Sequence, residues 1–105
     1  MNTPYKVNAA GQKIEVPSKV TGVGNTTLGD SAFTAITAPG NCKKILVKMR
    51  TDVAWKLAAA SAGTTYLSVG GTTMLELDFA AVSGATLFYA EAASGTPVLE
   101  VVALD

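Results

Sequence analysis

The chain has 105 residues, which fits a single domain, and 49% of them are hydrophobic while only 15% are charged. This composition excludes intrinsic disorder for most of the chain, because disordered segments have low hydrophobicity and a high net charge. Eight basic and eight acidic residues give a formal net charge of zero. The chain therefore lacks the basic excess that binding to nucleic acid requires, and little long-range repulsion opposes self-association.

The first thirty residues are rich in turn formers and poor in large apolar side chains. Two short strand-like pieces, 5–7 and 13–16, precede a stretch dominated by Gly, Thr and Asn. We predict an N-terminal arm or long loop over residues 1–30. It is either an ordinary disordered terminus or an arm that becomes ordered by pairing with a neighbouring subunit. In the second case, partner contacts are expected from the apolar residues of the two pieces: Tyr5, Val7, Ile14 and Val16.

From residue 31 to residue 105, short strand patterns recur between regular turns. A strand is predicted over 33–36, and the turn formers of 38–41 end it. The next strand, over 43–51, alternates between two faces. Its inward residues are apolar: Ile45, Val47 and Met49. Its outward residues are basic: Lys44, Lys48 and Arg50.

The alanine-rich segment 54–62 is the one place where a helix competes with a strand. A helical stripe would have to combine Trp55 and Leu57 with three alanines, and Gly63 with the following threonines would end it within two turns. We therefore predict a strand whose inward residues continue the alternating set: Val53, Trp55 and Leu57.

The remaining sequence predicts four more strands. Gly70-Gly71 lies between the strand patterns 66–69 and 74–79, which indicates a β-hairpin. Further turns lead into strands over 85–91 and 98–104. Within 74–79 the inward residues are large and apolar: Leu75, Leu77 and Phe79. Short strands at this spacing predict an all-β fold, a β-sandwich or jelly-roll-like barrel over residues 31–105.

The residue inventory disfavours catalysis. Without histidine, neither a Ser-His-Asp nor a Cys-His arrangement can form. Cys42, the single cysteine, is interpreted as a buried structural residue rather than a reactive thiol. Glu76 and Asp78 share one strand face and could hold a cation or act as an acid/base pair, but such alternation is typical of any half-solvated strand. We expect no enzyme activity, no cofactor, no metal and no small-molecule substrate.

The N-terminal residues and the hydropathy of the chain bear on its location. No apolar run follows a basic patch at the start of the sequence, so a secretory signal is not expected. No apolar stretch approaches the roughly 18 residues of a membrane span. We expect a protein that is made in the cytoplasm and has no membrane contact.

Five of the eight basic residues lie between residues 43 and 56, with Asp52 as the only acid among them. Lys44, Lys48 and Arg50 share one face, on which Leu46 indicates partial cover. This face is either solvated, or part of an edge strand that lysines protect from aggregation, or a patch that binds an acidic surface of a partner protein. No aromatic residue is interleaved with the cations between Lys43 and Arg50, which disfavours binding to single-stranded nucleic acid.

Four segments carry a resemblance to known proteins: 55–57 (WKL), 66–71 (YLSVGG), 75–79 (LELDF) and 84–91 (GATLFYAE). These segments, together with the low-charge composition of residues 31–104, resemble small virion proteins of tailed bacteriophages. Among those proteins, capsid decoration (cement) proteins are the most similar in size. The resemblance implies a sandwich or jelly roll, commonly a homotrimer, that binds the major capsid protein on the outside of the expanded head. It also implies an N-terminal arm that reaches a neighbouring subunit.

Two other functions remain open. A different phage structural component, such as a tail, baseplate or head-completion protein, would have the same low-charge composition. A carbohydrate-binding β-sandwich module would need clustered exposed aromatic residues and a polar or calcium site. The chain has only seven aromatic residues in all.

Overall fold

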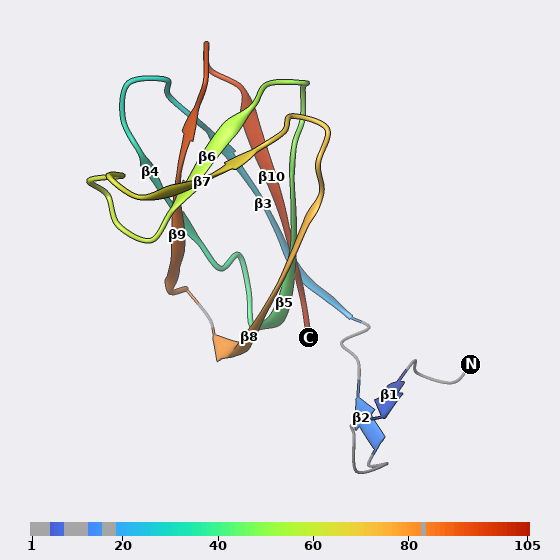
Figure 1. Cartoon of the computed structure of the whole chain (residues 1–105). Helices are drawn as coiled ribbons and strands as arrows, with labels where there is room; N and C mark the ends of the chain where they lie inside the picture. The colour runs from blue at the N-terminus through green and yellow to red at the C-terminus, as the bar shows by residue number, and fades with distance from the viewer. Residues whose placement is uncertain (1–4, 8–12, 16–18, 83) are drawn as a thin grey trace.

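A computed structural model describes residues 5–7, 13–15, 19–82 and 84–105 (Figure 1). Ten strands and no helix lie within these ranges, which confirms the predicted all-β class. No helix in the described part of the chain is long and apolar enough to cross a membrane.

Two short strands, β1 (Tyr5–Val7) and β2 (Lys13–Glu15), form an antiparallel ribbon in which Lys6 lies opposite Ile14. Figure 1 shows this ribbon outside the two large sheets. Both strand-like pieces predicted from the sequence are therefore strands, although Val16 lies outside the described residues.

The other eight strands form two four-stranded antiparallel sheets. One, here called the front sheet, has the order β3-β10-β5-β8. Its strands are β3 (Val20–Thr27), β10 (Val98–Leu104), β5 (Cys42–Met49) and β8 (Leu75–Val82). The other, the back sheet, has the order β4-β9-β6-β7. Its strands are β4 (Thr34–Thr37), β9 (Thr86–Ala92), β6 (Trp55–Ala58) and β7 (Tyr66–Val69).

The strand pairing is nested. The innermost pair along the chain is β6 with β7, followed outward by β5 with β8, β4 with β9 and β3 with β10. The successive pairs alternate between the two sheets, as if one long hairpin had been wrapped around the core. This connectivity is that of a jelly roll, the more specific of the two predicted architectures.

The core lies between the sheets because alternate residues of each strand point inward. On β5, Ile45, Val47 and Met49 are buried as predicted. Trp55 is also buried, and it packs against Phe88 of β9 with the ring centroids 6.0 Å apart. Each such side chain stabilises the fold by about 1.5–3 kcal/mol relative to an exposed one.

The prediction of an arm or loop over residues 1–30 is wrong for its last third. Val20–Thr27 is strand β3, which pairs with β10, and Leu28 is buried in the core. The strand lacks large inward side chains because another loop takes their place. A β-carbon on Gly22 would lie 2.4 Å from the Pro39 carbonyl oxygen, so the β4–β5 loop packs directly on the backbone of β3.

The predicted hairpin at Gly70-Gly71 is also wrong. β7 pairs with β6, and β8 pairs with β5, so this segment carries the chain from the back sheet to the front sheet. The turn is closed by the Thr73 N–H, which donates to the Gly70 carbonyl oxygen at 3.1 Å.

Candidate functional site

The predicted basic face lies on the outside of the front sheet. Lys44, Lys48 and Arg50 share this face, but β5 lies between β10 and β8, so the prediction of a lysine-protected edge strand is wrong. Lys44 forms ion pairs with Glu76 and Asp78 of β8. A hydrogen bond to Glu76 and the negative charges of both carboxylates raise the pKa of Lys44, against the opposing effect of desolvation.

The other two basic residues share one carboxylate on β10. Lys48 Nζ lies 3.5 Å from Glu100 Oε1, and Arg50 Nε donates to Glu100 Oε2 at 3.1 Å. The hydrogen bond from Arg50 and the positive charges of Lys48 and Arg50 lower the pKa of Glu100. The three cations thus meet three carboxylates on this face, so it is a charge-paired surface rather than a basic patch.

Apolar side chains continue this outer face toward β3. The strand register places Val23, Val102 and Leu46 in one row across β3, β10 and β5, and it places Val20 opposite Leu104 beside that row. Val20 and Val23 are 58% and 64% exposed, and the other three are half-buried. We call these five residues the apolar patch. A contiguous exposed patch with a charged border is typical of an interaction surface.

The apolar patch ends at an open sheet edge. Among the described residues, β3 pairs with β10 on one side only, and its eight residues include no charged side chain and no proline. Charged residues and prolines are common devices that keep exposed edges from pairing with other chains. This edge therefore offers backbone hydrogen bonds without a charged barrier.

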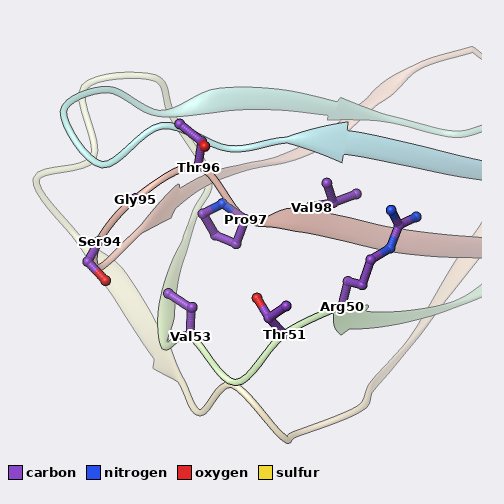
Figure 2. A pocket seen from close by; sticks show the side chains of 8 residues that line it. All are labelled: Arg50, Thr51, Val53, Ser94, Gly95, Thr96, Pro97 and Val98. Atoms are coloured by element: carbon purple, nitrogen blue, oxygen red, sulfur yellow. The ribbon is translucent and has the colours of Figure 1, made fainter.

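A cavity of about 410 Å³ lies at one end of the sandwich (Figure 2). Figure 2 shows Thr51 and Val53 on the β5–β6 loop, opposite the Ser94–Pro97 loop between β9 and β10. The Gly95 N–H donates to Asp30 Oδ2 at 3.0 Å, which braces this second loop. The lining residues include no carboxylate or thiol, and the guanidinium of Arg50 is bonded to Glu100. The cavity can accept a small polar group, but its lining carries no acid/base or nucleophilic pair.

The back sheet carries a tyrosine pair on its outer face. Tyr66 and Tyr89 lie opposite Ala58 on its two neighbouring strands, so the three residues form one row, in which Ala58 is buried. Lys56 lies 4.6 Å from the centroid of the Tyr66 ring and 3.7 Å from Glu91. This arrangement is a small aromatic surface with one ion pair beside it.

The remaining residues that the sequence singled out are Cys42 and four apolar residues of the N-terminal pieces. Cys42 is fully buried, and its burial, followed by the negative charge of Asp105, raises the pKa of the thiol. Among the described residues, no cluster of three or more His, Cys, Asp or Glu side chains could hold a metal ion. Tyr5, Val7 and Ile14 lie in the β1–β2 ribbon, and Val16 lies outside the described residues.

No protein-family model, curated protein or solved structure matches this chain. The apolar patch was not predicted, because its members are far apart along the chain and become neighbours only through the strand order. The alternation of Val102 and Leu104 with buried Leu99, Val101 and Ala103 on β10 was the available signal.

Proposed function

We propose that this protein is a non-enzymatic virion structural protein, a capsid decoration (cement) protein that binds the major capsid protein on the outside of a phage head and stabilises the head. The observation that carries the proposal is the apolar patch, which leads from a charge-paired face to an uncharged open edge on the same sheet. Such a surface is suited to lasting protein contacts.

The pairing of charges on the front sheet supports this proposal. Because Lys44, Lys48 and Arg50 are already neutralised within the domain, a partner need not provide a matching acidic surface. Apolar contact then supplies the binding energy, and repetition over a symmetric head raises the avidity. The resemblance of residues 31–104 to small phage virion proteins points to the same role.

A second candidate function, carbohydrate binding, is favoured by the tyrosine pair on the back sheet. Tyr66 is 48% exposed and lies in one row with Tyr89, and aromatic rings provide flat apolar surfaces on which sugar rings can stack. The Lys56 ammonium already lies over the Tyr66 ring, which reduces the area open to a ligand. We therefore place this function second.

The experiment is reconstitution on expanded heads of the encoding phage that have been prepared without this protein. Bound copies are counted by electron microscopy. Copies on every capsomer or capsomer junction support decoration, whereas a single ring at a vertex supports a head-completion or tail role. Absence of binding contradicts both.

Two variants identify the surface used. Val23→Lys charges the apolar patch, and Leu67→Lys places the same charge on a similarly exposed residue of β7 (57% against 64%). Loss of head binding in Val23→Lys alone supports the front sheet. For the second candidate function, Tyr66→Ala should abolish retention on a glycan array, and retention that survives it contradicts that function.

A further inference from the structure

The four sheet edges differ in how they are protected. β4 and β7 are short edges of four residues each, and the eight-residue edge β8 carries the exposed acids Glu76 and Asp78. β3 is also eight residues long but carries no charge. Among the edges of the two large sheets, β3 is the one that combines length with the absence of charged residues.

The free backbone groups of β3 can be assigned from its pairing with β10. The Leu28 N–H donates to the Pro97 carbonyl oxygen at 2.9 Å, and Thr27 lies opposite Val98. Because hydrogen-bonded residues alternate along an antiparallel strand, the N–H and C=O groups of Val23, Asn25 and Thr27 point away from β10. Their side chains are also exposed.

The first part of the same edge is covered by the β4–β5 loop. Thr21 Oγ1 donates to the Asn41 carbonyl oxygen, and a β-carbon on Gly40 would lie 2.7 Å from the Thr21 carbonyl oxygen. The open part of β3 therefore runs from Val23 to Thr27, and Asn25 is its central residue.

We propose that two copies of this chain pair antiparallel through their β3 strands about a two-fold axis at Asn25, so that the two front sheets become one continuous eight-stranded sheet. This pairing forms about six backbone hydrogen bonds from the groups that β10 leaves free. The two apolar patches then lie on the same side of the joined sheet and together form one larger surface.

The two-fold register and the absence of charge favour a second copy as the occupant. In a two-fold contact each residue meets its own counterpart or a near neighbour, so a charged residue near the axis would repel itself. Here Asn25 faces Asn25 of the other copy and Val23 faces Thr27, all of them neutral. The arrangement is a dimer, whereas the resemblance implies a homotrimer. It does not depend on the assembly to which the dimer binds.

The test uses purified full-length protein and two substitutions at the proposed axis. Asn25→Pro removes an N–H that the β3–β10 ladder does not use, whereas Asn25→Ala removes the side chain and keeps that N–H. Light scattering after gel filtration should find a dimer for the native chain and for Asn25→Ala. Asn25→Pro should weaken association by at least about tenfold, a change of about 1.4 kcal/mol.

Two further measurements keep the proposal testable if the Asn25→Pro variant misfolds. Val23→Lys should also weaken the dimer, while Leu67→Lys on β7 should not. Hydrogen exchange at the amides of Val23, Asn25 and Thr27 should slow as protein concentration rises. A monomer at all concentrations, a trimer of any stability, or a dimer that survives both Asn25→Pro and Val23→Lys overturns the proposal.

Discussion

Gly71 lies so close to Val53 that a β-carbon on Gly71 would be 2.3 Å from the Val53 backbone nitrogen. Gly71 is buried, and it belongs to the segment that carries the chain from β7 in the back sheet to β8 in the front sheet. The glycine is required here because the two stretches of backbone lie too close together to leave space for a β-carbon.

The substitution Gly71→Ala should therefore destabilise the protein. The added methyl group has no space, and overpacking of this kind costs about 1–3 kcal/mol. Chemical denaturation followed by Trp55 fluorescence measures the change. Gly29→Ala is the matched control, since a β-carbon there meets nothing within 4 Å, and its stability should stay within about 0.5 kcal/mol of the native chain. Equal losses in both variants would contradict the role of the close approach.

Phe88→Ala should destabilise the jelly roll severely. The ring is 3% exposed and packs against Trp55, so its removal loses burial and leaves a cavity, at a cost of about 3–5 kcal/mol. Met74→Ala removes a side chain that is 56% exposed and should change stability by less than about 0.5 kcal/mol. Urea denaturation of both variants measures the free energy of unfolding. A mild effect of Phe88→Ala would contradict the packing of Phe88 against Trp55 in the core.

Glu100 should contribute stability that is lost in acid. Its folded pKa is lowered, first by the hydrogen bond from Arg50 and then by the charge of Lys48, from an ordinary value of 4.5. As the pH falls, Glu100 is therefore protonated in the unfolded chain before it is protonated in the folded protein. The stabilisation is present above pH 4.5 and disappears as the pH falls through the folded pKa.

Glu100→Gln removes this titration. The variant should be less stable than the native chain at pH 7, and the difference should shrink as the pH falls below 4.5. Thermal or urea unfolding at a series of pH values measures it. A difference that stays constant from neutral to acid pH would show that the ion pairs do not control the acid response.

The Cys42 thiol should be unreactive in the folded protein. The Cys42 side chain is 0% exposed. Burial, followed by the negative charge of Asp105, raises the pKa of the thiol. Little thiolate therefore forms near neutral pH. A chromogenic disulfide reagent should report almost no thiol until denaturant is added, and then one thiol per chain. Rapid reaction of the folded protein would contradict this burial.

The sequence predicted best those strands whose two faces differ in polarity. On β5 the apolar residues Ile45, Val47 and Met49 alternate with cations, and the structure has the same alternation. β3 was missed for a physical reason, since its inward positions Gly22 and Gly24 pack against Pro39 rather than carrying apolar side chains. A strand covered by backbone does not show the usual hydrophobic pattern.

The site was less predictable because it depends on strand order. The pairing of Lys44 with Glu76 and of Arg50 with Glu100 joins residues 32 and 50 positions apart, and local spacing does not report such neighbours. Gly70-Gly71 shows the same limit: the glycines fit a hairpin turn, but here Gly71 permits the close approach to Val53. Whether these glycines form a hairpin turn or a crossing between the sheets depends on which strands β7 and β8 pair with.

The position of β10 has a consequence for synthesis of the chain. β10 is the last strand along the sequence, yet in the front sheet it lies between β3 and β5. While a ribosome still covers Val98–Leu104, β3 has no partner in its sheet and one side of β5 is open. The front sheet is therefore completed only after translation has passed β10, and until then the nascent chain exposes the unpaired edges of β3 and β5 to neighbouring polypeptides.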